Sequence, residues 1–301
     1  MENKVPEEYL NSIFCKSSET MVELPDNSIH LMITSTPYNG TKGSDGDFDL
    51  LTCLKSLKSV WAEVYRVLVP GGRACINVAN RRKTPYIPLH NHICRDMTDI
   101  GFLMRGEIIW NKTSIGSQTG DSRMHLSVAN PVLRNIHEYI LVFSKDSFTR
   151  LRKNKENTIR KDQFLRWSKS VWTIPSVAKS GIGRSGSFPE HLAYRLIQLY
   201  SFKGDVVLDP FAGIGATWVA AIKSDRYYVG YDKDQENVQL AKRLIANLHV
   251  QLELFEDEDL VSTKKDKKIE KASQETKQVR GRKSKLLPHD PFADLKYNPI
   301  S

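Results

Sequence analysis

Four consecutive residues, Ser35-Thr36-Pro37-Tyr38, follow a short apolar stretch that ends at Thr34. The stretch predicts a buried strand, and Pro37 restricts Thr36 to extended geometry, so the four residues mark a strand end. They place a hydroxyl, a constrained main-chain carbonyl and an aromatic ring there. Two hydrogen-bond acceptors and a stacking surface can hold a flipped-out nucleobase by its exocyclic amine. Taken alone, a strand-terminating turn with a tyrosine in the core explains the same residues.

A second motif lies much later in the chain, where the apolar run 206–208 leads into Asp209-Pro210-Phe211-Ala212-Gly213-Ile214-Gly215. The two glycines lack Cβ atoms and let the backbone approach a ligand closely. A carboxylate about 20 residues further on, Asp232, follows another apolar run and can accept hydrogen bonds from ribose hydroxyls. The third glycine of a dinucleotide site and the Gly-Lys-Ser/Thr of a P-loop are both missing. The pattern therefore predicts a cofactor site of another kind at a strand-to-helix turn.

In the order of its motifs, the chain closely resembles the S-adenosylmethionine-dependent DNA amino-methyltransferases of the β arrangement, in which the catalytic motif precedes the cofactor motif. The resemblance covers most of residues 10 to 250. It rests on Leu24-Pro25-Asp26-Asn27-Ser28-Ile29, Leu68-Val69-Pro70-Gly71-Gly72, His137-Glu138-Tyr139-Ile140-Leu141-Val142-Phe143, Trp172-Thr173-Ile174-Pro175, Phe188-Pro189-Glu190 and the run from Asp209 to Thr217. It implies a Rossmann-like α/β fold with a mostly parallel sheet and helices on both faces.

The resemblance also implies a role for each motif residue. The residues that would bind S-adenosylmethionine are Asp209, Phe211, Gly213 and Gly215 around its methionine part, Asp232 at its ribose, and Phe188 and Pro189 closing over it. Ser35 and the Thr36 carbonyl would accept hydrogen bonds from the target amine, and Tyr38 would stack on the extruded base. For Phe188, simple core packing is the alternative.

Two positions depart from the family pattern. The family commonly has Gly-Asp where this chain has Cys15-Lys16, so a carboxylate expected near the cofactor adenine is missing. Thr36-Pro37 replaces the usual Pro-Pro, but the family uses only the main-chain carbonyl of the first residue, so we expect activity to survive.

The target base follows from residue types. Cytosine C5 methylation needs a cysteine nucleophile, and no cysteine lies between Cys15 and Cys53. Family members with serine at the first motif position lean toward cytosine N4, and those with aspartate lean toward adenine N6. Ser35 therefore predicts transfer to cytosine N4 of duplex DNA, with adenine N6 as the alternative.

A basic segment follows the apolar run at 137–143. Residues 145–169 hold nine lysines or arginines and three acids, and the chain carries a formal net charge of +9. Residues 145–185 are the candidate DNA-recognition insertion, since cations bind the phosphates of a deformed duplex. The predicted DNA-contacting side chains are Arg81, Arg82, Arg150, Arg152, Lys153, Arg160, Lys161 and Arg166.

The 301 residues predict one methyltransferase domain, 1–255, and a basic, largely disordered tail, 256–301. The four scattered cysteines indicate neither a zinc site nor a disulfide framework, and no metal is expected. No window reaches the about 18 apolar residues of a membrane span, so we expect a cytoplasmic, DNA-associated monomer or homodimer. A cognate restriction endonuclease is the expected partner. Competing hypotheses are an RNA or small-molecule methyltransferase, and a DNA-binding regulator that has lost methyl transfer.

Apolar periodicity predicts the elements that position these motifs. We expect strands at 13–15, 28–34, 74–78, 106–110, 137–143, 205–208 and 227–231, and helices at 18–24, 50–68, 93–99, 191–200, 217–223 and 237–248. The run at 137–143 is expected to continue a parallel sheet.

Overall fold

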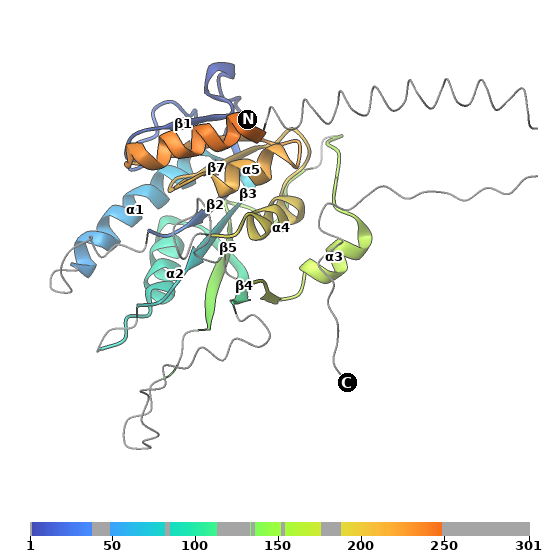
Figure 1. Ribbon diagram of the computed structural model, residues 1–301. Coiled ribbons are helices and arrows are strands. Elements are labelled where there is room, and N and C mark those ends of the chain that lie inside the picture. The colour runs from blue at the N-terminus through green and yellow to red at the C-terminus, as the bar shows by residue number, and fades with distance from the viewer. Residues whose placement is uncertain are drawn as a thin grey trace, which may run out of the picture. The chain divides into compact units, whose positions relative to one another are not determined.

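Eight strands form one sheet in the computed structural model, which describes residues 2–37, 49–81, 85–112, 133, 136–151, 154–175 and 188–248 (Figure 1). The strands are β1 (Ser12–Phe14), β2 (Ile29–Ser35), β3 (Leu68–Val78), β4 (Leu103–Asn111), β5 (His137–Ser144), β6 (Val171–Thr173), β7 (Val206–Asp209) and β8 (Tyr227–Tyr231). The chain divides into the units Met1–Leu248 and His249–Ser301. The second unit, which contains the predicted tail, lies outside the described residues.

The sheet has the order β1-β8-β7-β2-β3-β5-β4-β6. All neighbouring strands are parallel except β5, which runs antiparallel to both β3 and β4. The mostly parallel α/β architecture is therefore confirmed, whereas the parallel direction expected for 137–143 is wrong. An apolar run indicates burial on both faces of a sheet, but strand direction depends on the connection that precedes it.

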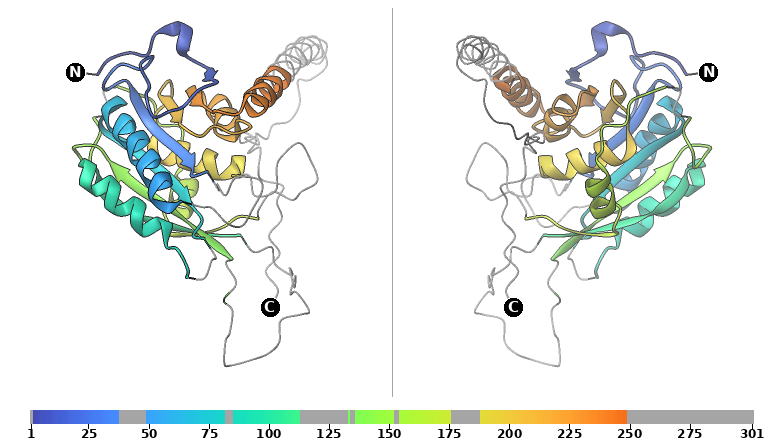
Figure 2. Two further views of the ribbon diagram at one scale, coloured as in Figure 1. Left: turned by 90° about the vertical axis from the view of Figure 1, so that its left-hand side faces the viewer. Right: turned by 90° about the vertical axis from the view of Figure 1, so that its right-hand side faces the viewer.

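Helices cover both faces of the sheet (Figures 1 and 2). Two of them, α1 (Leu50–Val67) and α2 (Leu89–Ile100), share a core with one face. The other face packs against α4 (Glu190–Tyr200), α5 (Ala216–Ile222) and a helix at residues 235–248. Each helix presents an apolar stripe to the sheet; in α1 the buried residues Leu57, Val60, Trp61 and Val64 recur at helical spacing.

Part of the basic segment belongs to this fold. It contains α3 (Lys161–Trp167) and leads into edge strand β6, neither of which the sequence predicted. Trp167 and Trp172 are buried, and the Arg195 guanidinium of α4 lies 5.6 and 5.5 Å from their ring centres. The predicted helical turn at 18–24 is instead a series of turns, next to the short 3-10 helix Glu7–Tyr9. None of the described helices is long and apolar enough to cross a bilayer.

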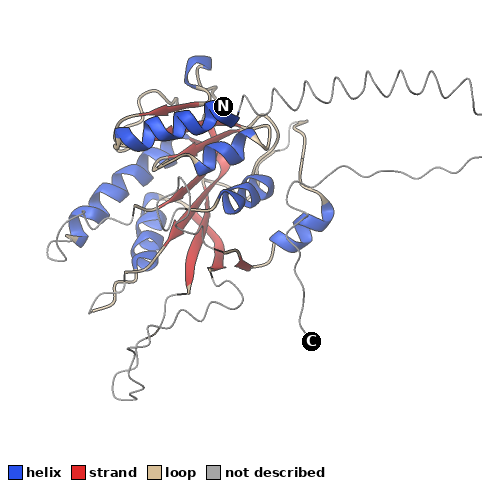
Figure 3. Ribbon diagram, in the orientation of Figure 1, coloured by secondary structure: helices blue, strands red, loops and turns tan. Residues whose placement is uncertain are grey.

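The connections diverge at the centre of the sheet. From β7 the chain passes through α5 to β8, which is the neighbour of β7 on the side away from β2. From β2 the chain passes through α1, on the opposite face of the sheet, to β3, which is the neighbour of β2 on the side away from β7 (Figure 3). In open α/β sheets such a topological switch point leaves a crevice at the carboxyl ends of the two strands. Both sequence motifs lie at this place, since β2 ends at Ser35 and β7 ends at Asp209.

Candidate active site

The first motif begins at the carboxyl end of β2. Ser35 is the last strand residue and is half-buried, while Thr36 is buried. The Thr36 amide donates to the Asn77 carbonyl of β3 at 3.0 Å, so the backbone stays beside β3 up to Pro37. This pairing holds Ser35 in place at the sheet edge. Tyr38, the predicted stacking residue, lies outside the described residues.

Asp209 joins the second motif to the first. One carboxylate oxygen accepts from Thr34 Oγ1 at 2.7 Å and from the Phe211 amide at 3.1 Å, and the other accepts from Thr217 Oγ1 at 2.6 Å. Burial raises the pKa of Asp209 to about 6, although these three donors act in the opposite direction. The side chain therefore links the end of β2, the loop after β7 and the start of α5. The sequence predicted a cofactor contact here and missed this internal role.

The two glycines have different structural reasons. Gly213 has a φ of +52°, and a Cβ there would meet no atom within 4 Å. Gly215, with a φ of +88°, precedes α5, and a Cβ there would lie 3.2 Å from the Ala241 Cβ of the helix at 235–248. Gly213 thus borders open space, whereas Gly215 is needed for its backbone conformation and for helix packing.

Asp232 follows β8 and faces the same loop. Its Oδ2 accepts from the Gly213 amide at 2.8 Å, and its Oδ1 accepts from the Asp234 amide at 2.8 Å. The predicted ribose carboxylate is thus brought against the predicted glycine loop. Its half-buried side chain is held by backbone donors on both oxygens.

The aromatic residues of the cofactor prediction pack against the core. Phe211 meets Trp61 of α1 edge-on, with ring centres 6.0 Å apart. Phe188 is half-buried against the core shared with α4, a position that leaves its cofactor role a prediction, and the buried Pro189 immediately precedes α4. Phe211 packs against the core on the α1 face of the sheet, whereas Phe188 packs against the core on the α4 face.

A carboxylate, Glu23, lies beside Lys16, the residue that departs from the family pattern. Lys16 Nζ donates to Glu23 Oε1 at 2.6 Å, and the Tyr231 hydroxyl donates to Glu23 Oε2 at 3.2 Å. Tyr231 is the last residue of β8, and Lys16 follows the end of the adjacent strand β1 by two residues. Glu23 precedes a proline turn in the sequence, and nothing there indicated this placement.

A row of hydrogen-bonded polar side chains extends from Ser35 through β3 and β5 to the residue that follows β4. Asn77 Nδ2 donates to Ser35 Oγ at 3.2 Å and to Glu138 Oε2 at 2.6 Å, and Lys112 Nζ donates to Glu138 Oε1 at 2.8 Å. Sequence reasoning missed Asn77 and Glu138. A polar residue within the dense apolar runs at 74–78 and 137–143 was the available signal.

The predicted DNA-contacting residues divide into separate places. Arg81 lies beyond the end of β3, paired through its backbone with Ile87, at the same sheet edge as Ser35. Arg160, Lys161 and Arg166 lie at α3, where both arginines contact Asp162. Three other predicted DNA-contacting residues, Arg82, Arg152 and Lys153, lie outside the described residues.

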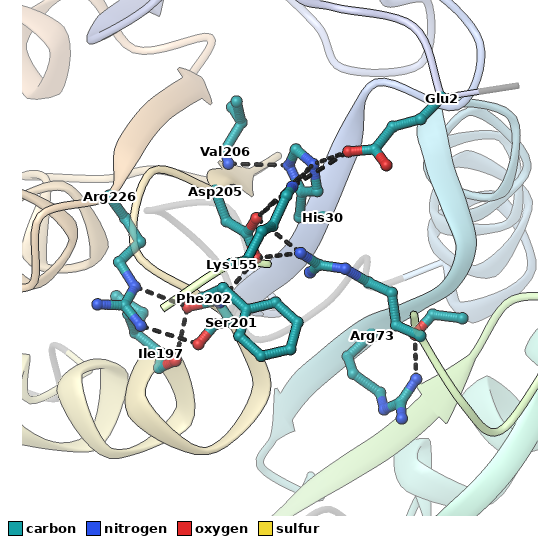
Figure 4. A network of polar contacts seen from close by, with 12 residues as sticks. Glu2, His30, Arg73, Lys155, Ile197, Ser201, Phe202, Asp205, Val206 and Arg226 are labelled. Carbon is teal, nitrogen blue, oxygen red and sulfur yellow. Dashed lines mark hydrogen bonds and ion pairs between the residues drawn. The ribbon is translucent and has the colours of Figure 1, made fainter. Parts of the chain in front are cut away.

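Arg150 lies near the amino-terminal end of β7, at the strand ends opposite the candidate site. Its Nη2 is 2.6 Å from Asp205, whose side chain is fully buried directly before β7. Figure 4 shows Lys155 and His30 beside the same carboxylate, with Glu2 contacting both of them; Lys155 Nζ is 2.9 Å from Asp205 Oδ1. Since β7 spans roughly 13 Å, this network is far from the carboxyl ends. This position favours a role of Arg150 within the fold over the predicted contact with DNA.

No group of three or more histidine, cysteine, aspartate or glutamate side chains within the described ranges could hold a metal ion. The donor atoms collected at the carboxyl ends are instead hydroxyls, amides and carboxylates. They suit an organic ligand that offers hydroxyl and amino groups.

Comparison with known proteins agrees with this geometry. A family model described as DNA methylase, N6_N4_Mtase, matches residues 29–243. The type II methyltransferase M.MthZI of Methanothermobacter thermautotrophicus is 31% identical over 258 residues, which cover 74% of this chain and 72% of the relative. M.MjaI of Methanocaldococcus jannaschii is 30% identical over 270 residues, covering 75% and 88% respectively.

A solved structure has the same fold. TTHA0409 of Thermus thermophilus, a candidate DNA modification methylase complexed with S-adenosyl-L-methionine, superposes with a TM-score of 0.63 at 32% identity, covering 78% of this chain and 94% of that one. The family model includes both strand-end motifs and the switch point between them. The chain belongs to the N6_N4_Mtase family of DNA methylases.

Proposed function

We propose that this protein transfers a methyl group from S-adenosyl-L-methionine to the exocyclic N4 of a cytosine flipped out of duplex DNA. DNA amino-methylation is the activity of its family. The observation that carries the proposal is the junction of the two motifs: Thr34, next to Ser35, donates directly to Asp209 of the glycine loop. A hydroxyl for the target amine and a loop for the cofactor therefore lie at neighbouring strand ends.

The residues at the ends of β7 and β8 fit S-adenosyl-L-methionine. Gly213 borders open space, and Asp232 is held beside it by the Gly213 amide. We assign Asp232 to the ribose hydroxyls and the loop from Asp209 to Gly215 to the methionine part, with Phe188 and Pro189 beside it. When bound, this cofactor supplies an electrophilic methyl group on a sulfonium.

Ser35 and the Thr36 carbonyl would draw the target amine out of conjugation with its ring. As acceptors for the two amine hydrogens, they direct the nitrogen lone pair toward the methyl group. No covalent link between enzyme and base is needed: the nitrogen–methyl bond would form as the sulfur–methyl bond breaks, the sulfonium would become a neutral thioether, and one amine proton would pass to solvent. Tyr38 is assigned to stacking on the base.

Serine at the first motif position favours cytosine N4 over adenine N6, which is the second candidate. A cognate restriction endonuclease acting on the same sequence would be the biological partner, and methylation would then protect host DNA from cleavage. Arg81 and the cationic side chains of α3 are assigned to the DNA phosphates.

Incubation with labelled S-adenosyl-L-methionine and unmethylated genomic DNA, followed by nucleoside mass spectrometry, tests the proposal. N4-methylcytosine is the expected product, and N6-methyladenine would replace the base assignment while retaining the enzyme class. Ser35→Ala should lower turnover about ten- to a thousandfold with cofactor binding nearly intact. Cofactor and DNA binding without any methylated nucleoside would refute the proposal in favour of a DNA-binding regulator.

A further inference from the structure

The polar row behind Ser35 lies on the sheet face that packs against α4 and α5. Asn77 is two residues beyond Cys75, and Glu138 is two residues before Ile140; both of these apolar neighbours belong to that core. From the contacts of this row we infer that Asn77, oriented by Glu138 and Lys112, is a positioning residue that fixes the Ser35 hydroxyl toward the target amine. The inference rests on the proposed function.

The orientation of the Asn77 amide follows from the chemistry of its neighbour. Glu138 is 4% exposed, and a buried carboxylate needs charge and hydrogen-bond partners, one of which is Lys112. An ionised carboxylate only accepts hydrogen bonds, so the side of the Asn77 amide that faces it at 2.6 Å must be the NH2 group. Glu138 therefore excludes the flipped amide.

This fixed amide determines what Ser35 can do. The same NH2 group lies 3.2 Å from Ser35 Oγ, so Ser35 accepts a hydrogen bond from Asn77. A serine hydroxyl has one hydrogen and two lone pairs, and it otherwise rotates to suit its surroundings. With one lone pair engaged by Asn77, one lone pair and the hydroxyl hydrogen remain. They match the exocyclic amine and the adjacent acceptor nitrogen of the base ring.

A second observation indicates that Asn77 serves the site and not only the fold. Asn77 is 1% exposed, and its Oδ1 has no hydrogen-bond partner within the described part of the chain. Leaving a buried acceptor unsatisfied is unfavourable, and such atoms in native structures call for an explanation. The unsatisfied acceptor belongs to the amide that contacts Ser35, and a catalytic site is one of the places where such a group is found in native structures.

A double-mutant cycle tests the inference in the full-length protein. Single-turnover methyl transfer at saturating cofactor and duplex DNA is measured for wild type, Asn77→Ala, Ser35→Ala and the double variant, together with the Kd of S-adenosyl-L-methionine. Asn77→Ala should slow transfer about ten- to a hundredfold and change the Kd less than about twofold. Because Asn77 acts through Ser35, the double variant should be no slower than Ser35→Ala.

Gln198→Ala is the matched control, since Gln198 is similarly buried and bonds Thr158 from α4, outside the row. It should retain the wild-type rate. Additive losses in the cycle would show that Asn77 acts only on the fold and would overturn the inference while leaving the function intact. Absence of methyl transfer by the wild type would overturn both.

An exchanged pair covers the case in which Asn77→Ala does not fold. In Asn77→Asp with Glu138→Gln, the two side chains keep a hydrogen bond, but position 77 can only accept from Ser35. The serine hydrogen is then directed away from the base, and transfer should slow with cofactor affinity retained. A rate equal to or above that of the wild type would refute the inference.

Discussion

Replacing Asp209 with asparagine should remove a pH-dependent cost from the free energy of unfolding. The carboxylate is buried, and its pKa is about 6, compared with 3.8 for an unperturbed aspartate. At about 1.4 kcal/mol per pKa unit, ionisation of Asp209 costs the folded state about 3 kcal/mol. The stabilisation by Asp209 is complete below pH 3.8 and is lost as the pH rises through 6, because the folded state holds its proton more tightly.

Urea denaturation of wild type and Asp209→Asn from about pH 4 to about pH 8 measures this cost. All other titrating groups are common to both proteins, so the difference between the two free energies isolates Asp209. That difference, variant minus wild type, should rise with pH by about 2–3 kcal/mol, with roughly half of the rise above about pH 5. The absolute offset depends on how the asparagine NH2 group meets Thr34 or Thr217, and only the pH-dependent part is predicted.

Thr217→Val sharpens the same test. Thr217 Oγ1 donates to Asp209 at 2.6 Å and lowers its pKa, so its loss should move the titration step to higher pH. A flat difference curve for Asp209→Asn, or one that falls with pH, would refute the reasoning, since it would mean that the three hydrogen bonds outweigh burial.

Three further predictions concern the fold around the site. Gly215→Ala should lower the free energy of unfolding by about 2 kcal/mol, because φ is +88° and the new Cβ would press on Ala241. Thermal unfolding measures this loss, and an unchanged Tm would contradict the packing argument. Arg150→Met should lower the free energy of unfolding by about 3 kcal/mol, because the buried charge of Asp205 loses one of its cationic partners. DNA binding measured by fluorescence anisotropy should not weaken; weaker binding with unchanged stability would favour the DNA contact predicted for Arg150. Burial lowers the pKa of His30, whose Nδ1 accepts a hydrogen bond from a backbone amide. The free energy of unfolding should therefore fall as the pH drops below 6.5 and through that lowered pKa. His30→Asn should remove this pH-dependent loss, which urea titrations at about pH 5 and about pH 7.5 measure.

The strand and helix positions were largely accessible from local pattern. The predicted strand at 227–231 coincides with β8, and the predicted helix at 50–68 coincides with α1 except at its last residue. These elements have strong apolar periodicity, which reflects the burial of one face or of both. The helix within the basic segment and the strand that follows it were missed because seven and three residues are too short for a periodic signal.

The site was predictable to the level of motifs. Glycines at positive φ, a carboxylate after an apolar run and a hydroxyl before a proline each express a local backbone or chemical requirement. The partners of these residues are not local. Asp209 is held by Thr34, 175 positions away, and the Ser35 contact Asn77 is separated from it by 42. No pattern along the chain encodes such pairs.

The sequence by itself determined the α/β class, the order of the two motifs and the family resemblance, because these depend on neighbouring residues. Only the tertiary structure decided that the basic segment divides between helix α3 and a network before β7, where Arg150 contacts the buried Asp205 at the strand ends opposite the candidate site. It also decided that Asn77 and Glu138 lie in one hydrogen-bonded row with Ser35. Strand order and direction bring distant residues together, and burial makes their hydrogen bonds obligatory.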